Sequence, residues 1–412
     1  MFIYLYLTLK VYIYLYLILI INYSLFYILL VIYYYLVNSH SIYFYFLLLF
    51  NVGLTYIILV FIMFLSNHLM DNMGNFNSYV CDKYILENNK FVRNRKLPQE
   101  CIMKYVTWNR GRTTALEALY FMEEYWGKMD MDVSKQAISE RRMIIDPKAY
   151  IDINDDLLQR IYTEPELKKF KGYYLAAHDG SIFDLPNYPT ICEDFSIGEN
   201  INHSKLTATA RVSTMVDVLN EFILSSTIIS RKSSEPDLAI DHLEDVKNII
   251  DLEKTISICD RGYDSKKLML KIMQLNSYFV IRLKKTTFID QRYKLTKNDE
   301  IIEVPLTKSF IKTLPDKKLR NYAKKQQKLK LRIINITLPT GEIETLATNL
   351  FDESMTIQDF KTIYNKRWTI ETNYDIEKQT RNRKFLRSKK NNHRTRLLLR
   401  RICIQYSNSN QT

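Results

Sequence analysis

The sequence lacks the paired spacings that disulfide frameworks and zinc sites need. Its five cysteines (Cys81, Cys101, Cys192, Cys259 and Cys403) are scattered, and its six histidines show no ligand spacing. A signal-peptide cleavage pattern and internal repeats are also missing. The sequence therefore gives no signal for a disulfide scaffold or a zinc site, and its scattered cysteines suit a reducing compartment.

Residues 1–66 contain no Ala, Pro, Arg, Asp or Glu, yet they hold 13 of the 30 tyrosines. Two runs in this segment are apolar enough and long enough to span a bilayer. Natural membrane helices use Ala and Gly for close packing, whereas the residues present here are those of A/T-rich codons. Two interpretations stay open: translated upstream DNA, with a true start near Met70 or Met73, or a membrane anchor.

Acidic residues are missing from residues 379–412, which carry ten Lys or Arg. Of the net charge of +13, this tail contributes +10 and Lys10 another +1, which leaves +2 for residues 67–378. A basic chain favours nucleic acid as its partner. Here that inference depends on whether the tail belongs to the protein, so overall charge is weak evidence.

Residues 74–168 space their apolar side chains at helical intervals. Ser134 is a candidate N-cap for a short helix that exposes Lys135, Ser139 and Arg142. Two interpretations are open for this region. One is a small DNA-binding module in which Lys135 and Arg142 contact DNA, and the other is a helical packing domain with a solvated basic face.

From residue 172 the spacing is that of strands. Residues 172–183 predict a strand ending near Asp179, and residues 207–230 predict an antiparallel strand pair. A helix over residues 236–250 precedes a strand–helix–strand unit over residues 255–284, which implies parallel strands with a right-handed crossover. The predicted fold class is therefore α/β, with a mixed sheet covered by helices.

Residues 286–350 predict a β-rich insertion, with a hairpin around the turn Pro339-Thr340-Gly341. Just before this hairpin, residues 317–332 hold eight Lys or Arg and no acid. They predict either a surface that follows nucleic-acid phosphates or a solvated loop and an edge strand protected by lysines.

Residues Thr356 to Lys378 predict one helix without Pro or Gly, capped by Thr356. On a helical wheel its apolar side chains form one stripe, made of Phe360, Ile363, Tyr364, Ile370 and Tyr374. Arg367, Glu371 and Lys378 fall inside this stripe. Burying an unpaired charge costs on the order of several kcal/mol, so these charges need a partner, a metal or a phosphate. An Arg367–Glu371 ion pair at the rim of the core is the alternative.

Asp179 and Asp260 each end a predicted strand and precede a glycine by one or two residues. Functional sites gather outside such strand ends. With Glu371 they make three carboxylates without a convergent His or Cys, a donor set that favours Mg²⁺ or Mn²⁺ over zinc. Two such ions support phosphodiester chemistry, in which Arg367 and Lys378 would hold backbone phosphate.

These motifs resemble the DDE transposases of bacterial insertion sequences, and the helix resembles the YREK signature of the insertion-sequence-four group. The resemblance covers about residues 90 to 378 and rests on HDGS at Asp179, CDRGY at Asp260, and Tyr364-x2-Arg367-x3-Glu371-x6-Lys378. It implies a ribonuclease H-like core with an N-terminal helical domain and a β-rich insertion. His178 is a departure, because an apolar residue is usual before the first Asp.

The resemblance also implies roles for these residues. Asp179, Asp260 and Glu371 would form a metal-bound catalytic triad that uses Mg²⁺ or Mn²⁺. Tyr364, Arg367 and Lys378 would grip phosphates at the transposon end. The implied partners are double-stranded DNA, both transposon ends and target, and a second copy of the chain in a homodimer on DNA. The resemblance also implies the order of events, which is cleavage at the element's ends and then strand transfer by the freed 3′-hydroxyl.

The basic tail does not resemble the amphipathic segment with which the family continues. When the tail is back-translated with A/T-leaning codons and shifted by one base, the new reading has apolar residues at helical spacing. We therefore expect a lost reading frame from Gln379 on, and weak or absent activity because Glu371 would be poorly held. The alternative is a genuine basic arm that binds DNA phosphates.

The expected organisation has six parts: a hydrophobic segment (1–69), a helical DNA-binding candidate (74–168), the first part of the catalytic core (170–285), the β-rich insertion (286–350), the catalytic helix (351–378) and the basic tail (379–412). The expected location is cytoplasmic, on the nucleoid, with a membrane as the alternative if residues 1–66 are genuine. The rival functions are a non-catalytic DNA-binding relic and a membrane-anchored protein.

Overall fold

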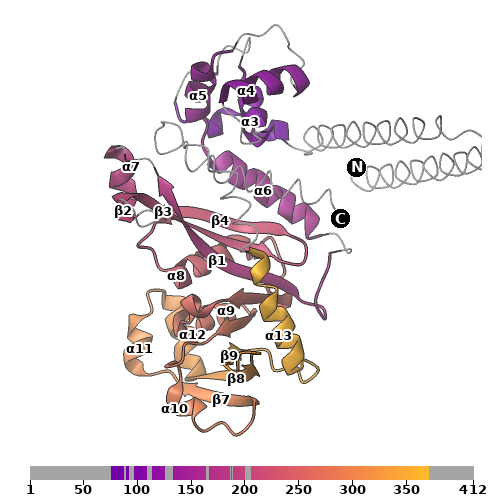
Figure 1. The fold of residues 1–412 in the computed structure, drawn as a ribbon, viewed down its shortest axis with the longest axis vertical. Helices are drawn as coiled ribbons and strands as arrows, with labels where there is room; N and C mark the ends of the chain where they lie inside the picture. Colours follow the sequence, from indigo (N-terminus) through magenta and orange to yellow (C-terminus); the bar gives the residue numbers. More distant parts are fainter. Residues whose placement is uncertain are drawn as a thin grey trace, which may run out of the picture. The chain divides into compact units, whose positions relative to one another are not determined.

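The computed structural model describes residues 76–87, 90–91, 97–108, 114–125, 133–163, 167–185, 187, 189–199 and 206–370 (Figure 1). The hydrophobic segment, the basic tail, Glu371 and Lys378 lie outside the described residues. The chain divides into two compact units between Asn72 and Met73, and every element below belongs to the second unit. Within the described ranges, no helix has the length and apolar character needed to cross a membrane.

One mixed sheet organises the described part of the chain. Its strands follow the order β2-β3-β1-β5-β6-β9-β8-β7, and β4 pairs with β3. β1, β3 and β4 pair antiparallel, whereas β5 and β6 lie parallel to β1. This is a ribonuclease H-like arrangement, so the predicted fold class is confirmed. The strand bounds are Tyr174–Leu185 (β1), Ser196–Glu199 (β2), Leu206–Asp217 (β3), Phe222–Ser230 (β4), Thr255–Cys259 (β5), Tyr278–Arg282 (β6), Asp299–Pro305 (β7), Lys328–Thr337 (β8) and Ile343–Thr348 (β9).

Helices cover both faces of this sheet. Apolar residues of α8, α9 and α12 pack with one set of strand side chains, and those of α13 pack with the other set. The helix bounds are Gln99–Trp108 (α3), Thr114–Tyr120 (α4), Lys135–Met143 (α5), Lys148–Ile161 (α6), Pro189–Asp194 (α7), Glu235–Val246 (α8), Lys266–Gln274 (α9), Ile289–Arg292 (α10), Lys308–Thr313 (α11), Lys317–Gln326 (α12) and Ile357–Asn365 (α13).

The helices before β1 have an apolar core of their own, which includes Cys101, Tyr105, Phe121 and Ile138. Short single turns complete this region: Phe76–Tyr79 (η1), Asp82–Tyr84 (η2) and Phe121–Tyr125 (η3). Helix α6 also contacts the sheet. The hydroxyl of Tyr162, just after this helix, donates to Asp217 Oδ2 at 2.6 Å.

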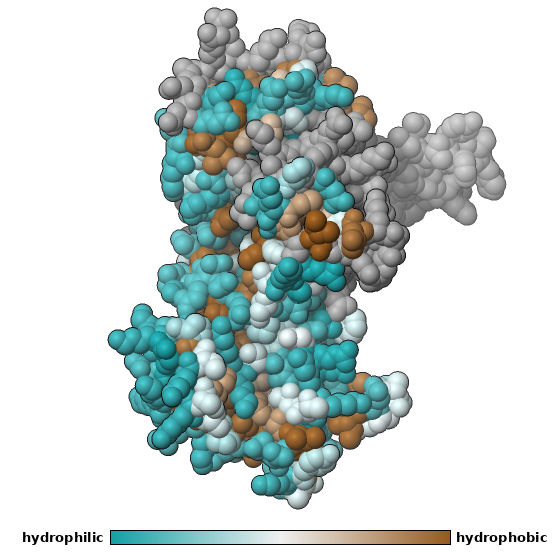
Figure 2. Space-filling view, turned by 90° about the vertical axis from the view of Figure 1, so that its left-hand side faces the viewer, coloured by the Kyte–Doolittle hydropathy of each residue, from teal (hydrophilic) through white to brown (hydrophobic). Residues whose placement is uncertain are grey.

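The insertion extends the sheet through β9, which pairs with β6. The predicted hairpin is confirmed, because β8 and β9 pair antiparallel around a turn in which Gly341 has φ +81°. The predicted loop and edge strand over residues 317–332 are wrong. Asp316 caps helix α12 with its side chain, and β8 lies between β7 and β9. The face that carries α11 and α12 is mainly hydrophilic (Figure 2).

The expectation of one continuous helix from Thr356 is also wrong within the described residues. Helix α13 ends at Asn365, and a turn follows at Lys366 and Arg367. At this turn the backbone hydrogen bonds span three residues instead of four. Arg367 N–H donates to Tyr364 O, and Ile370 N–H donates to Arg367 O. These i to i+3 bonds tighten the backbone. The apolar stripe is nevertheless buried as predicted at Phe360, Ile363, Tyr364 and Ile370.

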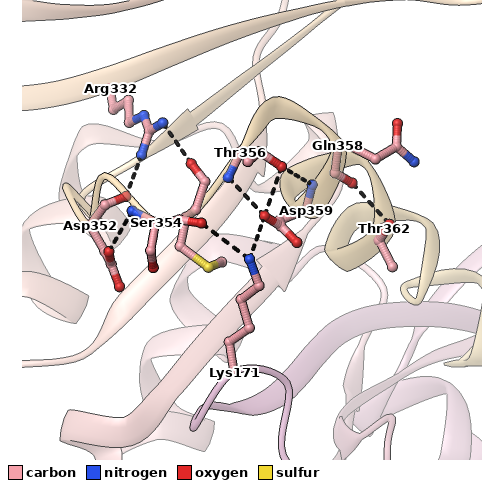
Figure 3. Close-up of polar contacts among 9 residues, drawn as sticks. Lys171, Arg332, Asp352, Ser354, Thr356, Gln358, Asp359 and Thr362 are labelled. Carbon is pink, nitrogen blue, oxygen red and sulfur yellow. Dashed lines mark hydrogen bonds and ion pairs between the residues drawn. The ribbon is translucent and has the colours of Figure 1, made fainter.

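The start of α13 is held by a set of polar contacts (Figure 3). Thr356 and Asp359 form a capping box, in which each side chain accepts from the backbone N–H of the other. Lys171, just before β1, donates to Asp359 Oδ2 at 2.8 Å and to the carbonyl of Ser354 at 3.1 Å. Arg332 of β8 donates to the carbonyls of Asp352 and Met355. The beginning of α13 is thereby tied to both β1 and β8.

The capping box predicts a stability effect at Thr356. The substitution Thr356→Ala leaves the N–H of Asp359 without its acceptor and should lower the free energy of unfolding by about 1 kcal/mol in urea titrations. Thr362→Ala is the matched control, because among the described residues that hydroxyl donates to the carbonyl of Gln358 and caps no helix N-terminus, and its effect should stay within about 0.5 kcal/mol. Equal losses in both variants would contradict a specific role for the cap.

Asp359 predicts how this part of the fold responds to acid. The hydrogen bond from Lys171, followed by those from Thr356, lowers the pKa of Asp359 to about 2. A carboxyl with a depressed pKa stabilises the fold above its unfolded pKa of about 4 and loses that effect as the pH falls toward 2. Asp359→Asn should therefore show a shallower loss of stability between pH 4 and 2 than the wild type. Parallel curves would contradict the bond to Lys171.

Candidate active site

Two carboxylates stand side by side where parallel strands stop pairing. The β1–β5 register runs from Tyr174↔Thr255 to His178↔Cys259, so Asp179 and Asp260 are the next residues on neighbouring strands. The predicted strand end at Asp179 is wrong, however. β1 continues to Leu185 because β3 pairs with it antiparallel beyond that point, with Asp179 opposite Thr214. Only the parallel pairing with β5 ends there, so from Asp179 on β1 has no partner strand on its β5 side.

Alternation along the strands decides which way these side chains face. Leu175 and Ala177 of β1 and Ile258 of β5 pack in the apolar core on the α13 side of the sheet. Successive side chains of a strand point to opposite faces. Asp179 therefore shares the face of Leu175 and Ala177, toward α13, whereas His178 points to the side of α8 and α9.

A tight turn fixes the Asp260 carboxylate. Asp260 caps the short helix Arg261–Tyr263 (η5), and its Oδ1 accepts the N–H of Gly262 at 2.8 Å. The N–H of Tyr263 donates to the carbonyl of Asp260 at 3.1 Å. Asp260 is thus oriented by the backbone of its own loop.

The end of α13 brings Tyr364 and Arg367 to this region. Both are buried, with 3% and 7% of their surface exposed, and the guanidinium carbon of Arg367 lies 4.8 Å from the Trp368 ring centroid. Burial raises the pKa of Tyr364 most, the Arg367 charge opposes this rise, and Asp260 adds to it. The Arg367 guanidinium and the Asp260 carboxylate thus both act electrostatically on the Tyr364 hydroxyl. The prediction that Arg367 falls within the buried stripe is confirmed.

The pKa of the Cys259 thiol depends on the same charged groups. Burial raises its pKa well above the usual value, Asp260 and Asp179 raise it further, and Arg367 lowers it. Both carboxylates and the guanidinium therefore act electrostatically on this thiol. Glu371 follows Ile370, which is buried against the same core, but Glu371 and Lys378 themselves lie outside the described residues.

The donor set fits a hard divalent cation. Adjacent Asp carboxylates are oxygen ligands of the kind that Mg²⁺ and Mn²⁺ prefer. Within the part of the chain that the structure describes, no group of three His, Cys, Asp or Glu side chains is placed to hold a metal ion. The two described carboxylates therefore need a further donor, for which Glu371 is the candidate from the sequence pattern.

The DNA-contact expectation for Arg142 is corrected by its burial. Ser134 does cap α5, because its hydroxyl accepts the N–H of Ala137 at 3.1 Å, and Lys135 is exposed. Arg142, however, has only 1% of its surface exposed. It lies on the face of α5 that packs against the helical core, and burial lowers its pKa. The expectation of an exposed Arg142 is therefore wrong, and we do not propose it as a DNA contact.

A basic cleft beside Asp260 was missed from the sequence. It has a volume of about 460 Å³, and its walls include Asp260 and Gly262 together with five cationic side chains: Arg261, Arg282, Lys284, Lys285 and Arg292. The sequence signal for this cleft is the run RLKK at the end of β6, which by itself fits the end of a strand equally well.

Hydrogen bonds shape the floor of this cleft. Arg292 donates to the carbonyls of Lys284 and Thr287, and Asp264 accepts the N–H of Lys284 at 2.8 Å. Arg282 forms an ion pair with Glu344 at 3.2 Å. Arg261, Lys284 and Lys285 are exposed, so these three present their charge to the outside.

A comparison with protein families identifies the class of this chain. Residues 171–406 match the model of the family described as Transposase DDE domain. This match covers more than half of the sequence, and the chain belongs to that family. The match also includes residues 379–406, so it gives no support to a lost reading frame there.

Among solved structures, the chain is similar to a piggyBac transposase in a synaptic complex with hairpin DNA, determined by cryo-EM. The sequence identity is 11% and the TM-score is 0.40, with 81% of this chain and 73% of that chain covered. No curated protein matches the chain.

His178 predicts a pH effect next to the site. Its ring is buried, with Nε2 3.3 Å from Ser257 Oγ, and burial lowers its pKa to about 3. The unfolded chain binds a proton below about pH 6.5 and the folded chain does not, so stability falls as the pH drops below 6.5. Between pH 6.5 and 5 the wild type should lose about 2 kcal/mol more than His178→Leu in urea unfolding. Identical pH profiles would rule out a buried neutral His178.

Proposed function

We propose that this chain is the DNA transposase of a bacterial insertion sequence, of the group that carries the YREK signature. Membership in the family implies polynucleotidyl transfer in general terms. The observation that carries the finer proposal is the β1–β5 register, which makes Asp179 and Asp260 neighbours, with buried Arg367 and Tyr364 beside them. Within this proposal, the enzyme cleaves phosphodiester bonds at the element's ends and joins them to target DNA.

Asp179, Asp260 and Glu371 are the proposed ligands of Mg²⁺ or Mn²⁺. When bound, such ions activate a water or a 3′-hydroxyl and stabilise the leaving oxygen. The chain supplies the alignment. The η5 turn orients Asp260, and the capping box and Lys171 fix the start of α13, from which the chain leads to Glu371. A misplacement of about 1 Å in such a site can cost roughly 10²-fold in rate.

Phosphate binding is assigned to two groups of cations. Arg367 and Lys378, together with Tyr364, are the proposed contacts to phosphates at the transposon end, as the YREK resemblance implies. Arg261, Lys284 and Lys285 are exposed around the cleft that Asp260 lines. They can attract the DNA backbone toward the carboxylates through its charge. Double-stranded DNA is the proposed partner, bound by a homodimer, and Lys135 is an exposed candidate contact on α5.

Two regions outside the described residues modify this proposal. A lost reading frame after Lys378 would weaken or abolish activity by removing the segment that supports Glu371. A genuine membrane anchor in residues 1–66 would tether the enzyme. The coding DNA with its flanks decides the frame and the start codon, and it also shows whether inverted repeats border the gene.

The catalytic proposal is tested by nicking of a supercoiled plasmid that carries the gene with its flanking DNA. The full-length chain should nick this plasmid in Mn²⁺ and not in EDTA, and Asp179→Asn, Asp260→Asn and Glu371→Gln should each reduce nicking to background. DNA binding without any nicking would favour the non-catalytic relic. Nicking that survives in Asp260→Asn would refute the assigned site.

The cleft predicts a specific change in DNA affinity. Removing two phosphate contacts with Lys284→Ala and Lys285→Ala should reduce the slope of log affinity against log salt by about 2. Lys324→Ala with Lys325→Ala on α12 is the matched control, since those lysines are equally exposed but do not line the cleft. If the α12 pair changes the slope and the cleft pair does not, DNA follows the α11–α12 face instead.

A further inference from the structure

The carboxylate of Glu235, the first residue of α8, lies against both glycines that follow the two aspartates. A Cβ placed on Gly262 would lie 2.8 Å from Glu235 Oε2 and 3.0 Å from Asp260 Oδ1. A Cβ placed on Gly180, next to Asp179, would lie 3.3 Å from Glu235 Oε1. The two oxygens of Glu235 thus face the β1 backbone next to Asp179 and the Asp260–Gly262 turn. A side chain at position 262 would displace the Glu235 carboxylate and crowd Asp260 Oδ1.

Arg211 of β3 holds Glu235 in this place. Its Nη1 forms an ion pair with Glu235 Oε1, and both side chains are largely shielded, with 17% and 28% exposed. Arg211 Nη1 also lies 3.4 Å from the Cβ position of Gly180. The pair therefore fills the space behind Asp179 and Asp260 from the α8 side of the sheet.

This arrangement has an electrostatic consequence. Glu235 and Asp260 are like charges that approach each other around Gly262, and like charges repel in the absence of a cation. The negative potential of Glu235 favours a cation near Asp260, while Arg211 opposes this effect. Because partly shielded charges interact more strongly than those in bulk water, this pair contributes to the potential at the site.

We propose that Glu235 is a positioning residue of the metal site. It acts through Asp260, and the positive charge of Arg211 partly offsets its negative charge. Glu235 is not a metal ligand in this arrangement. It supports the Asp260–Gly262 turn and adds negative potential behind it, and Arg211 limits that potential so that affinity for the ion stays moderate. The inference rests on the proposed function, because it assumes that Asp179 and Asp260 bind a divalent cation.

The test is a titration of the full-length chain with Mn²⁺, in which free Mn²⁺ is followed by electron paramagnetic resonance. Glu235→Gln keeps the shape and removes the charge, and it should weaken Mn²⁺ binding about tenfold. Arg211→Met leaves the Glu235 charge unopposed and should tighten binding by a similar factor. Glu235→Asp retains the charge and should recover most of the affinity that the Gln variant loses. Thermal unfolding of each variant verifies that it folds.

A matched ion pair elsewhere provides the control. Arg160 and Asp156 on α6 are similarly shielded, with 30% and 32% exposed, and Asp156→Asn should leave Mn²⁺ affinity unchanged. Shifts of opposite sign in the Glu235 and Arg211 variants support the inference. Equal or absent shifts, with only a loss of thermal stability, would reduce the pair to a structural role. If Asp260→Asn binds Mn²⁺ like the wild type, the metal site itself fails and the inference falls with it.

Discussion

The structure depends on one short parallel pairing, that of β1 with β5, which stops at His178 and Cys259. Because the pairing is in register up to that point, Asp179 and Asp260 emerge together. Because side chains alternate along β1, Asp179 faces α13 and His178 faces the opposite core. A shift of the register by one residue would exchange these faces and bury the carboxylate among apolar side chains. The paired carboxylates are thus a property of the sheet, and the loops only refine their orientation.

Two further devices act on this sheet from opposite sides. On the α13 side, the capping box, Lys171 and Arg332 fix where the helix begins, and the buried side chains of Tyr364 and Arg367 follow from that start. On the α8 side, Arg211 and Glu235 lie behind the glycines. The absence of a side chain at Gly180 and Gly262 therefore lets the Arg211–Glu235 pair approach the backbone next to the two aspartates.

Much of this could be predicted from the sequence because its signals are local. The β3–β4 and β8–β9 pairs, the strand–helix–strand unit at residues 255–284 and the buried stripe of α13 all follow from periodicity. Other features are set by tertiary contacts. The extension of β1 to Leu185 depends on its β3 partner, the burial of Arg142 depends on how α5 packs, and the turn at Lys366 interrupts a pattern that is helical on both sides. The basic cleft joins residues from β6, η5 and β9, which no single window of sequence reveals.

The most direct test of the central claim is to map where a divalent cation sits along the chain. Fe²⁺ can replace Mg²⁺, and hydroxyl radicals generated at the bound iron cut the nearby backbone, so that fragment masses identify the site. The account predicts cuts near Asp179 and Asp260, together with cuts near Glu371 if that residue completes the triad, and suppression of these cuts by excess Mg²⁺. Cuts clustered elsewhere, or a pattern that Asp260→Asn leaves unchanged, would contradict it.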